Sequence, residues 1–253
     1  MVIDSWITSN HLKLSPEKCS VMKFSSARLP AKPSYIMRGI PLPSEDSLKI
    51  LGVTFTSTLD FSLQVASVVA RARRVLGFVS RVSKPCGPAT FALLYTSLVL
   101  PILEYGCAVW SPNQQHLIAR VESVQRRASR ILYARSMKSP PADYATRLKM
   151  AKWRPLRQRQ GVSSTVTQMR LLCRLLDGSL ADTPLSSAVR VNKRSGQPEP
   201  LHTRTKRHGS SAIPAAVREF LTLPMSVRAP PPRTSEDSKQ LCSLYSRHLS
   251  SDS

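Results

Sequence analysis

The 253-residue sequence predicts a mainly helical α+β fold, and three observations point to it. Across about residues 19–55, apolar residues alternate with polar ones in short runs, which is typical of a small antiparallel β unit. Across about residues 61–177 they recur every three or four positions among many arginines, which predicts a basic helical bundle. Beyond the bundle the periodicity fades, which indicates a poorly ordered C-terminal extension. The expected division is therefore 1–57, 58–178 and 179–253.

The expected β unit begins after the end of an amphipathic helix, which we place at residues 2–14. Residues 19–25 alternate apolar and polar side chains and predict the first strand. Residues 35–37 and 40–42 predict two further short strands on either side of a turn. Residues 47–55, SLKILGVTF, predict the strongest strand of the chain. A unit of this size needs more packed surface to be stable.

The first helix of the bundle is expected at residues 61–84, where valine, leucine and alanine recur at helical spacing. Asp60 precedes the first periodic residue, so we expect its carboxylate to cap the helix N-terminus. The sequence Pro-Cys-Gly-Pro at 85–88 is expected to end the helix. Arginines lie off the apolar stripe, at Arg71, Arg74 and Arg81.

The second helix is expected at residues 89–109 and is apolar nearly all round, which predicts a buried core helix. Pro101 should kink this helix or split it in two. Glu104 lies within it, and a buried carboxylate needs a partner. A salt bridge to an arginine of the following helix is favoured over a catalytic role, because no second carboxylate or histidine lies nearby in the sequence.

Pro112-Asn113 should open a third helix, in which Leu117, Val121 and Val124 begin an apolar face that continues through Leu132. Arginine supplies much of the opposite face. Further along the chain we expect a short basic helix and turn at 141–160, helices at 162–177, 213–223 and 238–249, a loop or disordered stretch at 180–212, and a proline-rich linker at 229–233.

The formal net charge is +22, and most of it lies in the middle of the chain. Residues 61–160 carry 17 basic and 3 acidic residues, a net charge of +14. A surface of one sign attracts polyanions, because each neutralised phosphate releases counterions. Nucleic acid is the favoured partner; a solvated surface, an acidic membrane and an acidic protein are the alternatives. The candidate nucleic-acid contacts are Arg71, Arg73, Arg74, Arg81, Arg120, Arg126, Arg127 and Arg130.

Other functional classes lack support in the sequence. The five cysteines are far apart, with neither metal-ligand nor redox spacing, which favours a reducing compartment. No stretch predicts a membrane span or a signal peptide, so we do not expect a secreted protein. There is no glycine-rich phosphate loop and no paired aspartates of the kind that hold Mg²⁺. We therefore expect no cofactor, membrane or small-molecule substrate for this chain.

Three stretches, in this order, carry a resemblance to a known family: WITSNHLKLSPEKCSVMKFS, LKILGVTFTSTLDFSLQVASVVARARRVLGFVSR, and LLYTSLVLPILEYGCAVWSP followed by LIARVESVQRRASRIL. Together they resemble the C-terminal part of the reverse transcriptase of non-LTR retrotransposons of the LINE-type, jockey-like kind. The resemblance covers about residues 1–150. It rests on Trp6, Asn10, Leu12, Lys13, Lys18, Leu51, Gly52, Tyr95, Pro101, Glu104, Tyr105, Gly106, Trp110, Gln125 and Arg126.

The resemblance implies the end of the palm with strands that help hold the primer, then a helical thumb and an extension. It also implies that the catalytic aspartates precede residue 1, and that Mg²⁺ belongs to that palm active site. An intracellular location, in the nucleus or cytoplasm, follows from the same resemblance. An RNA-directed DNA polymerase fragment of this kind would bind RNA or an RNA–DNA duplex, with a protein partner possible at the exposed palm edge. The alternative is a non-catalytic helical module that binds protein, or an inert transposon relic.

Overall fold

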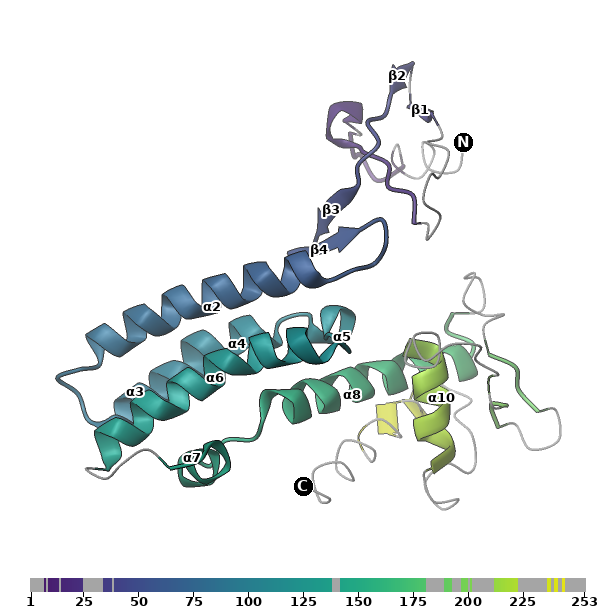
Figure 1. Cartoon of the computed structure of the whole chain (residues 1–253). Coiled ribbons are helices and arrows are strands. Elements are labelled where there is room, and N and C mark those ends of the chain that lie inside the picture. The colour runs from purple at the N-terminus through teal and green to yellow at the C-terminus, as the bar shows by residue number, and fades with distance from the viewer. Residues whose placement is uncertain are drawn as a thin grey trace. The chain divides into compact units, whose positions relative to one another are not determined.

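The computed structural model confirms a mainly helical fold with two small antiparallel sheets (Figure 1). The chain divides into two compact units, Met1–Ala70 and Arg71–Ser253, and the boundary falls within helix α2 (Ser62–Val82). The three-part division expected from the sequence stays a prediction. The structure describes residues 7, 9–13, 15–24, 34–37, 39–137, 142–180, 189–192, 197–199, 201, 212–222, 236, 237, 239, 240 and 243.

The first unit contains a short 3-10 helix, η1 (Pro16–Lys18), and the strand pair β1 (Ile36–Met37) and β2 (Ile40–Pro41). This pair confirms the two short strands expected at 35–37 and 40–42. The strand expected at 19–25 is wrong, because within its described part only Val21 pairs, in an isolated bridge with Ser44. An alternating pattern favours extended backbone, but a strand also needs a neighbouring strand to pair with. Most of the helix expected at 2–14 lies outside the described residues.

The segment expected as one strand at 47–55 is instead a hairpin of β3 (Ser47–Ile50) and β4 (Val53–Thr56). Leu51 and Gly52 form the turn and both have positive φ, at 47° and 84°. Two left-handed residues match the twist of the flanking strands, which is why such turns are common in hairpins. Glycine tolerates this conformation, and the turn imposes it on the leucine as well.

Helix α2 begins where the sequence predicts, and the Asp60 carboxylate holds its start. That carboxylate accepts hydrogen bonds from the backbone amide of Ser62 at 3.1 Å and from its hydroxyl at 2.7 Å. At the other end, Arg135 donates to the backbone oxygens of Ser80 at 2.6 Å and Ser83 at 3.2 Å. Carbonyls in the last turn of a helix lack intrahelical partners, so this guanidinium satisfies groups that would otherwise be unpaired.

The single helix expected at 89–109 is broken into α3 (Pro88–Leu94), the π-helical segment η2 (Tyr95–Val99), α4 (Leu100–Glu104) and α5 (Cys107–Trp110). Pro101 cannot donate a backbone hydrogen bond, so the ladder is interrupted next to the π-helical turn, as the sequence predicts. Gly106, with φ of 64°, then separates α4 from α5. The expectation of burial on all sides is wrong, because large apolar side chains are exposed at Leu93, Leu98, Tyr105 and Val109.

The remaining helices of the second unit are α6 (Gln115–Ser136), α7 (Tyr144–Ala151), α8 (Leu156–Leu176) and α10 (Ala212–Thr222). The apolar face expected on α6 is confirmed, with Leu117, Val121, Val124, Ala128 and Leu132 all buried. Helix α8 begins at Leu156, six residues before the helix expected at 162–177, and the turn expected near residue 160 is helical. Pro155 stands at its N-cap, a place where a proline interrupts no helical hydrogen bond.

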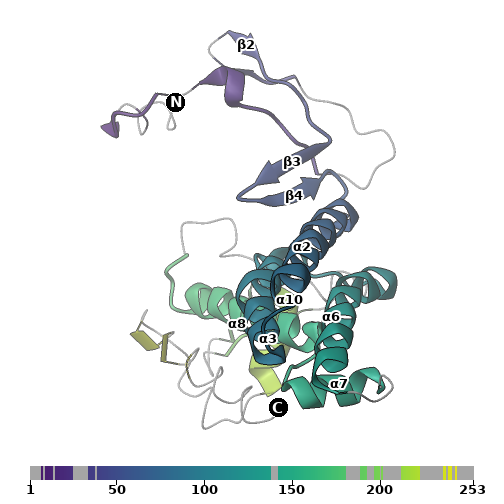
Figure 2. The same cartoon turned by 90° about the vertical axis from the view of Figure 1, so that its left-hand side faces the viewer.

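Helix α10 packs against the C-terminal half of α8 (Figures 1 and 2). Their shared core consists of Met169, Leu172, Cys173, Ala216, Val217 and Phe220, all buried. The short helix expected at 213–223 is therefore confirmed. Most of the loop expected at 180–212, the linker at 229–233 and most of the helix at 238–249 lie outside the described residues. Within the part of the chain that the structure describes, no helix is long and apolar enough to span a membrane.

Candidate nucleic-acid interface

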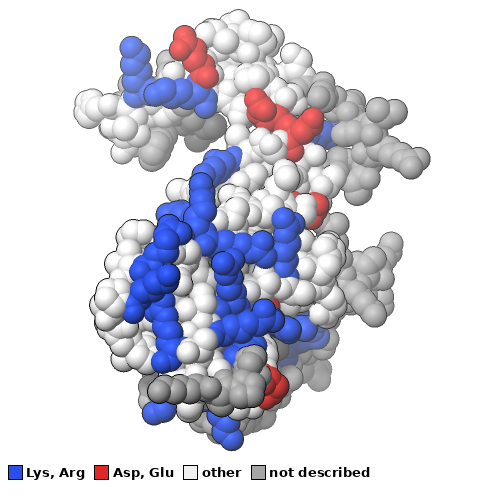
Figure 3. Space-filling model, turned by 60° about the vertical axis from the view of Figure 1, so that its left-hand side comes forward, with Lys and Arg blue, Asp and Glu red and all other residues white. Residues whose placement is uncertain are grey.

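The eight arginines expected to contact nucleic acid lie on two helices of the second unit, and every one of them is exposed. Figure 3 shows lysine and arginine side chains running in bands over the helices of this unit. We call these residues the α2–α6 arginines: Arg71, Arg73, Arg74 and Arg81 on α2, and Arg120, Arg126, Arg127 and Arg130 on α6.

Two hydrogen bonds join α2 and α6 and show their relative direction. Arg73 Nη2 donates to Ser123 Oγ at 3.0 Å, and ten residues along α2 the hydroxyl of Ser83 accepts from Arg135 Nη1 at 2.8 Å. The contacts advance along both helices together, so α2 and α6 run side by side in the same direction (Figure 1). The first contact also brings a guanidinium of α2 onto the outward face of α6. Arg73 therefore lies beside Ser123, which stands between Arg120 and Arg126 on α6 and is 50 residues away in the sequence.

Residues 61–160 contain three carboxylates, and each is held by the protein itself. Glu104 forms an ion pair with Arg159, with Oε1 2.5 Å from Nε. The salt bridge expected from the sequence is thus present, but its arginine lies on α8 rather than on the following helix. The other two are Glu122 and Asp143. Among the described residues, no carboxylate forms an ion pair with the α2–α6 arginines.

Asp143 caps helix α7. Its carboxylate accepts from the backbone amide of Ala145 at 3.0 Å and from the hydroxyl and amide of Thr146. The hydrogen bond from the Thr146 hydroxyl is the main reason why the pKa of Asp143 lies below its ordinary value. The residue is a typical N-cap at the positive end of the helix dipole.

Glu122 is buried and joins three helices. The carboxylate accepts from the phenol of Tyr144 on α7, and from the first-turn amides of α8 at Leu156 (3.3 Å) and Arg157 (3.4 Å). Burial, and then the hydrogen bond to Glu122, raise the pKa of the Tyr144 phenol well above 10. The Glu122 carboxylate lies at the N-terminus of α8, where the helix dipole favours a negative charge.

Gln125, one turn further along α6, links two more elements through its buried amide. Its Oε1 accepts from the Tyr95 phenol at 3.1 Å, and its Nε2 donates to the backbone oxygen of Arg154 at 2.8 Å. The Tyr95 ring stacks on Trp153 with centroids 4.4 Å apart. Sequence reasoning assigned no role to Glu122 or Gln125. Each is a polar residue at a position where the apolar stripe of α6 continues, and this pattern indicates a buried polar side chain that needs hydrogen-bond partners.

Some of the α2–α6 arginines also make contacts within the protein. Arg126 lies over the ring of Tyr144, 4.8 Å from its centroid, so it also contributes to packing through a cation–π contact. Arg73 is hydrogen-bonded to Ser123. Arg127 and Arg130 have no ion pair, hydrogen bond or ring contact with another described residue. These two guanidinium groups are therefore the clearest positions at which to test phosphate binding.

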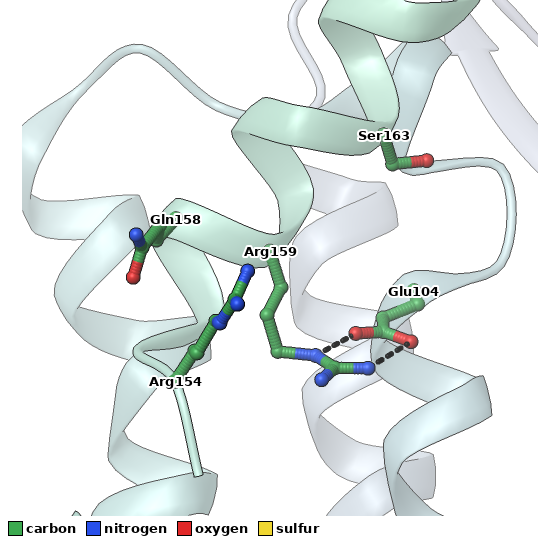
Figure 4. Close-up of a pocket in the computed structure, with 5 residues that line it drawn as sticks. All are labelled: Glu104, Arg154, Gln158, Arg159 and Ser163. Atoms are coloured by element: carbon green, nitrogen blue, oxygen red, sulfur yellow. Dashed lines mark hydrogen bonds and ion pairs between the residues drawn. The ribbon is translucent and has the colours of Figure 1, made fainter. Parts of the chain in front are cut away.

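A pocket of about 310 Å³ lies where α4 meets the start of α8 (Figure 4). The ion pair of Glu104 and Arg159 forms one side, and Arg154, Gln158 and Ser163 complete the lining. The hydrogen bond that Arg159 donates to Glu104 raises the pKa of the Arg159 guanidinium. Glu104 is the one carboxylate of this lining, which agrees with a structural role rather than a catalytic one. Within the described residues, no group of His, Cys, Asp and Glu could hold a metal ion.

Comparison with known proteins finds a distant relative. No family model matches the chain, and no solved structure matches it. Over 131 residues, which are half of its length, this chain is 24% identical to a Drosophila melanogaster protein described as "Probable RNA-directed DNA polymerase from transposon X-element". The matched segment covers only 14% of that protein's length. This similarity supports a distant relation to transposon-encoded RNA-directed DNA polymerases.

Proposed function

We propose that this chain is a C-terminal part of a non-LTR, LINE-type reverse transcriptase and that it binds RNA or an RNA–DNA duplex. The observation that carries the proposal is a set of eight exposed arginines on α2 and α6 with no carboxylate paired to them in the described residues. The similarity to a transposon RNA-directed DNA polymerase supports the same reading. In this proposal residues 1–57 end the palm, 58–178 form the thumb and 179–253 form an extension.

The proposed action of the α2–α6 arginines is to hold the duplex by its phosphates. Guanidinium groups pair with phosphate oxygens, and release of counterions from the nucleic acid drives the association. Such contacts position a duplex without reading its sequence, which suits a polymerase that must slide along any template. Polymerisation chemistry and its Mg²⁺ belong, in this proposal, to the catalytic aspartates of the palm.

The test is a titration of a fluorescent RNA–DNA duplex with the full chain at several salt concentrations. The test variant is Arg127→Gln with Arg130→Gln, because neither side chain has a packing role among the described residues. The charge-matched control is Arg170→Gln with Arg174→Gln, two exposed arginines on α8 that are absent from the α2–α6 set. Circular dichroism checks that both variants fold as the wild type does.

We expect the wild type to bind with a steep salt dependence. Each phosphate contact contributes about 0.9 to the slope of log K against log salt for B-form DNA, so losing two contacts should lower the slope by about 2. The α8 control should keep a slope near that of the wild type. Equal effects of the two variants would show that total charge, and not the α2–α6 arginines, controls binding.

A second candidate function, a helical module that binds protein, is favoured by one observation. Leu93, Tyr105 and Val109 leave apolar side chains more than half exposed along α3 to α5. Contiguous apolar patches mark protein contacts, and in this second function the three side chains would belong to such a contact. A folded wild-type chain that shows no salt-sensitive binding to the duplex would support this function, or an inert relic, over the proposed one.

A further inference from the structure

Phe78 stands on the outer surface of α2 with its side chain 53% exposed. Arg71 lies seven residues before Phe78 and Arg74 lies four residues before it. Arg81 lies three residues after it. Residues spaced by three, four and seven lie on one side of a helix, so these four side chains form a single line along α2. An aromatic ring is thus placed between cations on both sides.

The position of Arg81 strengthens this arrangement. Its Nη1 atom lies 3.7 Å from the place where a Cβ would stand at Gly77. The guanidinium therefore folds back along the helix and lies against the residue next to Phe78. The Phe78 ring itself has no stacking or cation–π partner among the described residues.

A single exposed phenylalanine needs no explanation in itself, because many apolar side chains lie at protein surfaces. Phe78 differs from an ordinary exposed apolar residue because positively charged side chains lie on both sides of it. Three cations that form no ion pair with a carboxylate of the described residues disfavour most apolar protein surfaces as a partner. An unpaired nucleobase supplies both requirements, since it has a flat face for the ring and a phosphate on each side for the arginines.

We propose that Phe78 is a stacking site for an unpaired base, so that α2 binds single-stranded nucleic acid next to the duplex. The inference rests on the proposed function and deepens it. Bases inside a duplex are already stacked and cannot present a face to Phe78. The preferred substrate is therefore a duplex with a single-stranded overhang, such as a template that extends beyond its primer.

The experiment compares the full chain binding a blunt RNA–DNA duplex with its binding of the same duplex carrying a single-stranded overhang. A 2-aminopurine base in the overhang reports stacking through quenching of its fluorescence. The variants are Phe78→Ala, which removes the ring, and Phe78→Tyr, which keeps it. The matched control is Leu93→Ala, which truncates another exposed apolar side chain of a helix outside α2. Circular dichroism confirms that each variant is folded.

We expect the wild type to bind the overhang substrate more tightly and to quench 2-aminopurine. Phe78→Ala should lose roughly five- to a hundredfold in overhang affinity, the range for one stacked base, while its affinity for the blunt duplex and its salt slope stay unchanged. Phe78→Tyr and Leu93→Ala should behave as the wild type does.

Two outcomes would overturn the inference, and they differ in what they imply. If blunt duplex binds with the expected salt dependence but the overhang gives no advantage, or Phe78→Ala keeps that advantage, the stacking site is wrong and the proposed function stands. If the folded wild type binds neither substrate, the proposed function fails and the inference fails with it. Binding of an acidic protein in place of both nucleic acids would belong to this second outcome.

Discussion

Replacing Glu122 with alanine should destabilise the second unit far more than removal of an exposed carboxylate. The buried Glu122 side chain accepts three hydrogen bonds, from the Tyr144 phenol and from the backbone amides of Leu156 and Arg157. Alanine would leave all three donors without this acceptor in a region that water reaches poorly. Helix α8 would also lose the negative charge at its N-terminus.

The expected magnitude follows from these contacts. A hydrogen bond from the phenol to the carboxylate contributes about 1.5–3 kcal/mol, the range for bonds to charged groups. The two amide contacts are long, at 3.3 and 3.4 Å, so together with the helix dipole we assign them about 1 kcal/mol. Glu122→Ala should therefore cost about 3 kcal/mol. Glu122→Gln should cost about half as much, because its amide oxygen still accepts while its NH₂ faces donors.

The assay is urea denaturation of the full chain, followed by circular dichroism, with Tyr144→Phe as the partner variant. A double-mutant cycle of Glu122→Gln and Tyr144→Phe should give a coupling energy of about 1 kcal/mol, because the first substitution weakens and the second removes the same hydrogen bond. Glu45→Ala, at an exposed carboxylate, is the control and should change stability by no more than about 0.5 kcal/mol. A cost for Glu122→Ala as small as that of the control would refute the reasoning.

Three further predictions concern the same unit. Burial raises the pKa of both Tyr95 and Tyr144 above the ordinary value of 10.0. The free energy of unfolding should therefore be retained below pH 10 and fall as the pH rises above it, because the unfolded chain loses these protons first. Tyr144→Phe should reduce that fall, measured by denaturation on either side of pH 10. Gly161→Ala should stabilise α8 by about 0.5–1 kcal/mol in the same assay, since a Cβ there meets no atom within 4 Å. Arg135→Ala should lower the free energy of unfolding by about 2–3 kcal/mol, because it removes the hydrogen bonds to Ser80 and Ser83; a loss below about 0.5 kcal/mol would contradict that role.

The long helices could be predicted from the sequence because their signal is local. The apolar stripes of α2 and α6 extend over many turns, and Asp60 marks the start of α2 within a residue or two. Exposure of the arginines follows from the same periodicity, since a residue off the stripe faces away from the core. The break near Pro101 is equally local, because a proline removes one backbone donor wherever it stands in a helix.

The features that escaped prediction depend on contacts between distant residues. Nothing local shows that Leu51 adopts a positive φ, so the β3–β4 hairpin appears in the sequence as one continuous strand. The partner of Glu104 is Arg159, 55 residues further along, and only the packing of α8 against α5 brings them together. Gln125 could have been suspected, because it is a polar residue on an apolar face.

The same packing explains why the candidate interface stays open to a polyanion. The negative charges of Asp143 and Glu122 stand at the starts of α7 and α8, where helix dipoles favour them, and Glu104 is paired with Arg159. A carboxylate used in this way cannot also neutralise an outward arginine. Removing one of these acids should therefore weaken the fold, while removing Arg127 or Arg130 should weaken phosphate binding alone. On the proposed function, Glu122→Ala should therefore lower stability and the Arg127→Gln with Arg130→Gln variant should lower nucleic-acid affinity, so that the two properties can be changed separately.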